Sequence, residues 1–213
     1  MKDARERLRH VLWIGGGTGA GKSSVAVALA ARYRLERYNW HDARGHATRS
    51  RLDRHPVRAA LMAMSLDEQW VSRSPDEMAE TTILFFAERF ERVLEDLLAL
   101  PQSRPIVAEG FGFLPELVST VIAGPHQAIW LVPTPAFRVL ALERRSWSTV
   151  DGTSDPERAR VNRLARDERI TAHIRRSAEA LGLRICEVDG SRTLAEITAE
   201  VERHFAPLLP ASP

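Results

Sequence analysis

Short apolar runs alternate along this chain with longer segments in which apolar residues recur at helical spacing. The short runs predict five strands, at residues 11–14, 35–40, 105–109, 128–132 and 183–188. The longer segments predict helices at residues 23–33, 75–100, 114–122, 135–146, 156–181 and 194–205. Strands that alternate with helices form parallel β–α–β units. The pattern therefore predicts a three-layer α/β fold around a doubly wound, mainly parallel sheet of five strands.

Two stretches depart from this alternation. Residues 42–73 carry many arginines and lack a strong apolar period until Ala59. Residues 144–169 surround a turn-rich centre, and Pro156 suits the first position of the helix that follows it. We expect both stretches to be inserts in a single domain that spans residues 1–213.

The segment from Gly16 to Ser23 reads GGTGAGKS and matches the P-loop, or Walker A, pattern G-x-x-x-x-G-K-[ST]. A predicted strand precedes it and a predicted helix follows it, which is the context that the pattern requires. Such a loop turns backbone N–H groups toward phosphate oxygens, and the helix N-terminus adds partial positive charge. We therefore expect a nucleoside triphosphate to be held by the loop residues Gly17, Thr18, Gly19, Ala20 and Gly21.

Three side chains at the start of the predicted helix complete this site. We expect Lys22 to reach the β- and γ-phosphates, Ser23 to ligate Mg²⁺ and Ser24 to bond the α-phosphate. Of the 30 lysine and arginine residues, only Lys2 and Lys22 are lysines. A chain that otherwise uses arginine thus has a lysine where a compact ammonium on a flexible stem is needed. A glycine-rich turn without a ligand is the alternative, and the spacing, the flanking elements and this lysine all disfavour it.

With this loop and this order of elements, nearly the whole chain resembles the small P-loop kinases. That group holds the shikimate, gluconate and nucleoside monophosphate kinases and the chloramphenicol phosphotransferase. The resemblance implies a P-loop NTPase fold of the nucleotide-kinase type that uses ATP and Mg²⁺. It also implies that residues 42–73 bind the phosphoryl acceptor and that residues 144–169 form a lid over ATP.

Two carboxylates follow predicted strands at the edge where parallel sheets bind ligands. Asp42 comes directly after the second strand, where a carboxylate can accept the proton of an acceptor hydroxyl. Its alternative role is that of a helix N-cap or turn residue. Glu109 ends the third strand, and the resemblance implies that it holds the water shell of Mg²⁺ or acts as the base. The two roles could be exchanged, and Gly110 would allow a close backbone approach beside them.

Arginines are the remaining candidates. The resemblance implies that lid arginines stabilise the transferred charge, with Arg163 and Arg166 as catalytic candidates and Arg144 as an ATP contact. The loop after the last strand would pass the adenine at Arg192, or it is an ordinary turn. In the acceptor region, Arg44 and Arg58 would bind substrate, because arginine recognises carboxylate and phosphate groups in a bidentate manner. For the lid arginines, the alternative is a solvated helix face with weak local ion pairs.

Composition excludes several other classes. The formal net charge is only +2, because 28 acidic residues nearly balance 30 basic ones, and this argues against a dedicated nucleic-acid surface. The single cysteine, Cys186, cannot form an intrachain disulfide and excludes a thiolate metal cluster. There is no guanine-reading N-K-x-D motif. Neither a signal sequence nor an apolar run of membrane-spanning length is present, so we expect a cytoplasmic protein.

The sequence therefore predicts an enzyme, a kinase that transfers the γ-phosphoryl group of Mg·ATP to a small metabolite. The arginines of the acceptor region favour an anionic acceptor that carries a hydroxyl or a phosphate. The alternative is a regulatory nucleotide-binding ATPase module without a small-molecule acceptor. Partners other than a small molecule are not expected, neither nucleic acid nor membrane. The identity of the acceptor and the oligomeric state do not follow from the sequence.

Overall fold

The computed structural model describes residues 2–41, 54–143 and 150–210 of the chain. The described residues contain one sheet of five strands, with every pair of neighbours parallel and the order β2-β3-β1-β4-β5. This confirms the predicted α/β fold with a parallel five-stranded sheet. The strand bounds are β1 (Val11–Gly16), β2 (Glu36–Asn39), β3 (Ile106–Glu109), β4 (Ala128–Pro133) and β5 (Arg184–Val188).

Helices fill the connections. Five of the six predicted helices form close to their expected bounds, while the predicted helix at 114–122 shortens to one turn, α7 (Pro115–Val118), followed by turns. The sequence pattern did not predict α1 (Lys2–Arg7), α4 (Pro56–Ala63), α5 (Leu66–Trp70) or the short 3₁₀ helix η2 (Pro125–Gln127). The predicted helices are observed as α2 (Lys22–Tyr33), α6 (Pro75–Ala99), α8 (Pro135–Glu143), α9 (Pro156–Ala180) and α10 (Leu194–Phe205).

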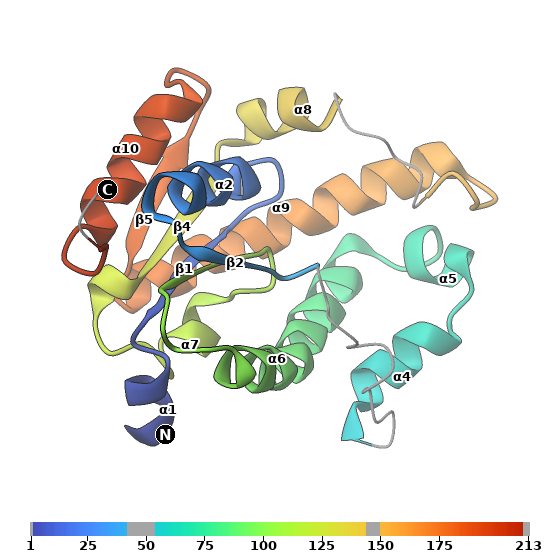
Figure 1. Ribbon diagram of the computed structural model, residues 1–213. Helices are drawn as coiled ribbons and strands as arrows, with labels where there is room; N and C mark the ends of the chain where they lie inside the picture. Colours follow the sequence, from blue (N-terminus) through green and yellow to red (C-terminus); the bar gives the residue numbers. More distant parts are fainter. Residues whose placement is uncertain (1, 42–53, 144–149, 211–213) are drawn as a thin grey trace.

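Helices cover both faces of the sheet (Figure 1). On one face, Val11 and Trp13 of β1 join a buried cluster with residues of α6, α7 and α9. On the other face, Leu12 and Ile14 join a second cluster with residues of α2 and α10. The split follows from the alternation of side chains along a strand, and it explains why β1 is apolar at every one of these positions. Among the described residues, no helix is long and apolar enough to cross a membrane.

The register of the strands decides what meets at the carboxyl edge of the sheet. Ile14 of β1 pairs with Glu109 of β3, and Asn39 of β2 pairs with the same Glu109. On the other side of β1, Gly16 pairs with Leu131 of β4. The P-loop therefore leaves the sheet beside the end of β3, so that Glu109 lies next to this loop.

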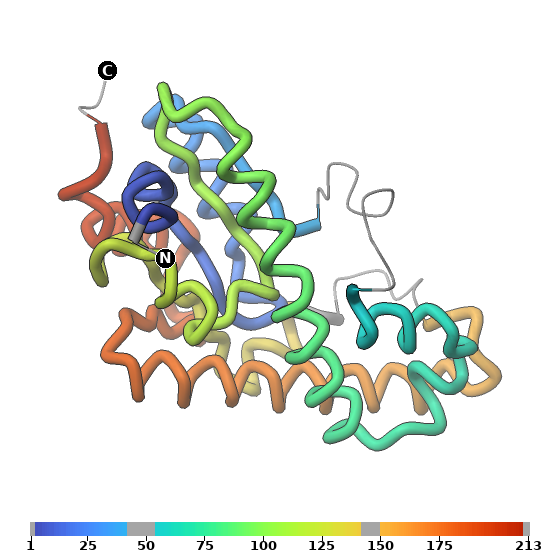
Figure 2. The backbone as a smooth tube through the Cα atoms, turned by 90° about the horizontal axis from the view of Figure 1, so that it is seen from below, coloured from blue at the N-terminus to red at the C-terminus, as the bar shows by residue number. Residues whose placement is uncertain are grey.

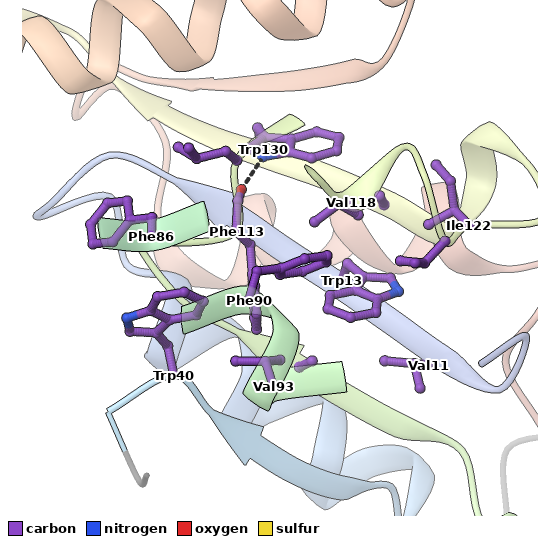
Figure 3. Packing of buried hydrophobic residues seen from close by; sticks show 14 of the residues in the cluster. Val11, Trp13, Trp40, Phe86, Phe90, Val93, Phe113, Val118, Ile122 and Trp130 are labelled. Atoms are coloured by element: carbon purple, nitrogen blue, oxygen red, sulfur yellow. Dashed lines mark hydrogen bonds between the residues drawn. The ribbon is translucent and has the colours of Figure 1, made fainter. Parts of the chain in front are cut away.

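An aromatic cluster lies under this edge of the sheet (Figure 3). The ring of Phe113 meets the rings of Trp13 and Trp40 edge to face, with centroids 5.1 and 5.3 Å apart. Its carbonyl accepts a hydrogen bond of 2.8 Å from the Trp130 indole. Edge-to-face pairs add to the apolar burial of such rings. The cluster thereby fixes the segment that follows Glu109.

Helix α5 lies against the long helix α9, and α4 lies against α6 (Figure 2). The Asp67 carboxylate of α5 accepts a 2.8 Å hydrogen bond from the backbone N–H of Ser154. Hydrogen bonding by the Ser154 side chain, and by this N–H, lowers the Asp67 pKa. Asn162 of α9 donates to the carbonyl of Trp70 at 3.0 Å. These contacts place α5 beside the second half of the predicted lid.

Candidate active site

The P-loop has the backbone geometry that its glycines allow. Gly16, Gly19 and Gly21 have φ values of 123°, 86° and 80°, which side-chain-bearing residues rarely adopt. Gly21 is the N-cap of α2 and supplies no side chain to the first N–H groups of this helix. Uncapped N–H groups and the helix dipole together favour an anion at this position.

Lys22 is the first residue of α2, and its side chain folds back over the loop. Its ammonium donates a 2.7 Å hydrogen bond to the carbonyl of Gly17. The same Nζ lies 5.8 Å from the centre of the Phe111 ring. Only 8% of Lys22 is exposed. The charge is thus placed at the mouth of the loop and partly shielded from water, where it acts more strongly on a phosphate than it would at an open surface.

The P-loop has one side that is exposed and another that is packed against the protein. Ser23 and Ser24 are exposed and line a cavity, together with Thr18 and Gly19. Gly17 is buried, and a Cβ at this position would lie 2.6 Å from Pro133 and 2.8 Å from the Thr171 hydroxyl of α9. The sheet and α9 therefore hold the loop from behind and leave its serines open to a ligand.

Glu109 is the carboxylate beside the loop. It is 3% exposed, and its Oε1 accepts a hydrogen bond from the side-chain amide of Asn39. The Oδ1 of Asn39 in turn accepts a 2.7 Å bond from the backbone N–H of His41. Gly110 follows, buried against Trp40 so closely that a Cβ would lie 2.3 Å from the Trp40 Cβ. The end of β2 therefore orients Glu109 through an amide.

A cavity of about 420 Å³ extends from the P-loop to α5, α6 and α9. Lys22 and Glu109 line it beside the P-loop, and Trp70 and Arg73 line it where α5 leads into α6. A volume of this order suits a small ligand. The described residues that line it are Thr18, Gly19, Gly21, Lys22, Ser23, Ser24, Trp40, His41, Leu61, Gln69, Trp70, Arg73, Met78, Thr82, Phe85, Phe86, Arg89, Glu109, Phe111, Arg163, Arg166 and Asp167.

Helix α9 supplies positive charge to this cavity. The guanidinium groups of Arg163 and Arg166 lie 5.8 and 4.8 Å from the centre of the Trp70 ring. Arg166 also donates through Nε to the Asp167 carboxylate at 2.9 Å, and Asp167 is only 3% exposed. The pairing satisfies a buried carboxylate and fixes the arginine at the same time.

The structure thus brings together most of the described candidates. Gly19, Gly21 and Thr18, the side chains from Lys22 to Ser24, Glu109, Arg163 and Arg166 share one cavity, and Gly17, Ala20 and Gly110 lie directly behind it. Two other candidates lie elsewhere. The backbone N–H of Arg58 donates to Glu88 at 3.0 Å, and its side chain lines a smaller cavity beside His55 and Arg92.

Arg192 is the second candidate outside the cavity. It follows β5 and bonds to Glu200 and to the carbonyl of Glu187. These contacts hold the turn before α10 together, as expected of an ordinary strand-to-helix turn. The remaining candidates, Asp42, Arg44 and Arg144, lie outside the described residues.

Three charged residues of the cavity were not predicted as individual site residues, namely Arg73, Arg89 and Asp167, although Arg73 and Asp167 lie within the two predicted inserts. Arg89 lies 4.9 Å from the centre of the Trp40 ring and donates to the Trp40 carbonyl, and burial lowers the pKa of its guanidinium. A signal for Arg89 was present in the sequence. It follows Phe85 and Phe86 by four and three residues, which places a charge on the apolar face of a predicted helix.

Comparison with known proteins adds little to this geometry. No model of a protein family matches the sequence, and no curated protein matches it. An uncharacterized protein from Eubacterium ventriosum is similar in structure, with a TM-score of 0.46 and 15% identity over 93% of this chain and 99% of that one. A shikimate kinase from Bacteroides thetaiotaomicron has a TM-score of 0.40 and 15% identity over 93% of this chain and 97% of that one. Similarity at this level establishes neither a family nor an activity.

Proposed function

We propose that this chain is a kinase that transfers the γ-phosphoryl group of ATP to a small anionic metabolite with a hydroxyl or phosphate acceptor. One observation carries the proposal. A single cavity joins the P-loop lysine and a buried strand-end carboxylate to two arginines of α9 and to the insert helices. A phosphate-binding loop alone needs no such second compartment, whereas a transferase must hold its acceptor in line with the phosphate.

In the proposed reaction the acceptor oxygen attacks the γ-phosphorus, and the bond between this phosphorus and the β,γ-bridging oxygen breaks. ADP leaves with the electron pair of that bond. Lys22 and the N–H groups of the P-loop stabilise the phosphate charge, while Arg163 and Arg166 face the transferred group from α9. The proton of the acceptor goes to a carboxylate, for which Asp42 is the first candidate and Glu109 the second.

The residues present suit Mg²⁺. Among the described residues, no group of three or more histidine, cysteine or acidic side chains converges on a metal site. Mg²⁺ is commonly held by one or two carboxylates together with substrate phosphates, so one hydroxyl, Ser23, and one carboxylate, Glu109, would be enough to hold it. When bound, the ion supplies neutralisation of phosphate charge.

We also propose a role for each of the two predicted inserts. Residues 42–73 serve as the acceptor-binding insert and residues 144–169 as the lid, with Arg44 on the acceptor side and Arg144 on the ATP side. Arg58 and Arg192 lie outside the cavity and receive no role in this assignment. The second candidate function is a regulatory ATPase module. It is disfavoured by the cavity between α5, α6 and α9, for which a nucleotide switch has no use.

ADP release from Mg·ATP tests the proposal, acceptor by acceptor. The panel spans sugar acids, nucleosides, nucleoside monophosphates, aminocyclitols and short oligonucleotides, with Lys22→Ala as the blank. The matched control is Lys2→Ala, which changes the only other lysine of the chain. Release that depends on one chemical class and on Lys22 supports the kinase. A slow release that no acceptor stimulates would favour the regulatory ATPase.

A further inference from the structure

Several aromatic rings line the cavity, among aliphatic, polar and charged side chains. Phe85 and Phe86 of α6 have centroids 6.1 Å apart, and Phe86 meets Phe111 edge to face at 5.4 Å. Trp70 of α5 lines the same cavity. Phe86 also lies against Trp40, as Figure 3 shows, with centroids 5.5 Å apart. A ligand in this compartment is therefore met on several sides by ring surfaces.

Three of the polar side chains that line the same cavity donate to main-chain carbonyls. The amide nitrogen of Gln69 donates to the carbonyls of Leu61 and Met64, at 3.1 and 3.0 Å. The hydroxyl of Thr82 donates to the carbonyl of Met78 at 2.7 Å, and Arg73 donates to the carbonyl of Glu77 at the same distance. These donors are used to hold α5 and the start of α6 in place.

Such a compartment discriminates between acceptors. A polyhydroxylated sugar would give up its hydration there, and each hydroxyl left without a partner would cost free energy. A flat ring would bury apolar surface and gain face or edge contacts with Phe85, Phe86 and Phe111. We propose that the acceptor carries a planar aromatic ring that lies against this wall. The inference rests on the proposed function and names the substrate class of the same site.

The position of Lys22 limits the distance between the ring of the acceptor and its reacting oxygen. Its Nζ is 5.8 Å from the centre of the Phe111 ring, so a ring packed on Phe111 lies close to the phosphate that Lys22 would hold. The reacting oxygen is therefore part of a short substituent on the ring. Arg163 and Arg166, which lie beside Trp70, stay assigned to the transferred phosphoryl group.

Matched pairs of compounds test the ring. Hydroxymethylbenzoate is compared with its saturated cyclohexane analogue, and uridine monophosphate with ribose phosphate. Binding is measured by ligand-observed NMR on the full chain with Mg²⁺ and a non-hydrolysable ATP analogue, and turnover is measured by ADP release. We expect the ring-bearing member of at least one pair to bind roughly fivefold to tenfold more tightly than its partner. The pair whose two members differ in affinity shows whether the acceptor is a nucleotide or another aromatic acid.

Variants assign the preference to the wall. Phe85→Leu keeps apolar volume but removes one of the rings, and it should reduce the preference. Leu84→Ala, at a 57% exposed position of the same helix, should retain it. If Phe85→Leu does not fold by circular dichroism, Trp70→Leu replaces it. Equal binding of saturated and aromatic partners, or an unchanged preference in the folded ring variant, would overturn the proposal.

The two proposals fail in different ways. ADP release that depends on Lys22 but responds equally to polyols and ring compounds would leave the kinase standing and remove the aromatic acceptor. Binding of ring compounds that depends on Phe85, without any phosphoryl transfer to them, would keep the aromatic site and count against the kinase. No binding of any ring compound would also overturn the inference.

Discussion

The side-chain amide of Asn39 donates a hydrogen bond to the buried carboxylate of Glu109 across the paired ends of β2 and β3. Because the Oδ1 of Asn39 is itself bonded to the N–H of His41, the amide orientation is fixed. A neutral amide orients the carboxylate without adding a second negative charge beside it. Asn39 is therefore a positioning residue for the carboxylate that we assign to Mg²⁺.

Replacing Asn39 by leucine should weaken this arrangement. We expect the Mg²⁺ concentration for half-maximal ADP release to rise about tenfold to a hundredfold, as is common when the partner of a metal ligand is removed. Tyr38→Phe is the control, since it lies next to Asn39 on β2 but bonds to Asp96 instead. An unchanged Mg²⁺ dependence in Asn39→Leu would remove the positioning role.

The roles of Asp42 and Glu109 can be distinguished by replacing each carboxylate with the corresponding amide. Asp42→Asn should lower the rate of transfer by about a hundredfold or more and leave ATP affinity nearly unchanged, because a general base acts on the acceptor and not on the nucleotide. Glu109→Gln should instead raise the Mg²⁺ requirement. Single-turnover rates and ATP titrations of both variants make the comparison. The reverse pattern would assign the base to Glu109.

Arg163 is the sharper test of α9, because Arg166 is also needed to pair the buried Asp167. We expect Arg163→Ala to lower kcat by roughly a hundredfold with little effect on folding, since an arginine that faces the transferred charge acts mainly in the transition state. Arg158→Ala, at an exposed position of the same helix and outside the cavity, is the control. Equal kcat values for the two variants would place Arg163 outside the mechanism.

Gly16 is a test of the fold beneath the P-loop. A Cβ there would lie 2.0 Å from the carbonyl oxygen of Leu131, at a φ of 123°. We expect Gly16→Ala to cost about 3 kcal/mol or more in the free energy of unfolding, from overpacking and backbone strain together. Gly124→Ala, with φ of −167° and nothing within 4 Å, should change it by less than about 0.5 kcal/mol. Urea unfolding of both variants decides the point.

His204 makes stability depend on pH. Burial lowers its pKa below the ordinary value of 6.5, while its Nε2 lies 2.8 Å from the carbonyl oxygen of Ala128. His204 therefore binds a proton more readily in the unfolded chain than in the folded one. The stabilisation is therefore present above pH 6.5 and is lost as the pH falls through that value toward the folded pKa.

Replacing His204 by glutamine should flatten this dependence. The glutamine amide can still donate to the Ala128 carbonyl but does not titrate. Burial lowers the pKa of His10 as well, so we expect a smaller loss of stability on acidification, not its disappearance. The urea midpoints of unfolding of both proteins, taken from pH 8 to pH 5, measure this loss of stability. A slope as steep as that of the wild-type chain would show that other groups control the acid limb.

Local patterns were enough to predict much of the architecture. The predicted strands match all five observed ones within two residues. For β1, β3 and β4 the reason is that strands buried on both faces leave little room for polar residues. Helix α5 was missed, although Ser65 and Glu68 form a capping box that the sequence displays. Helix α7 was predicted too long because its apolar residues continue into turns. Apolar spacing alone does not reveal where a helix ends.

By itself, the sequence determined the P-loop and its lysine, because the chemistry of phosphate binding lies within eight consecutive residues. It also determined which strand ends carry candidate carboxylates. Only the tertiary structure decided that Asn39 orients Glu109, that Arg89 and Asp167 enter the cavity, and that the cavity wall is aromatic. These relationships depend on strand register and on helix packing between residues far apart in the chain. No local pattern encodes them, because each side chain reaches the site only through its neighbours in the folded core.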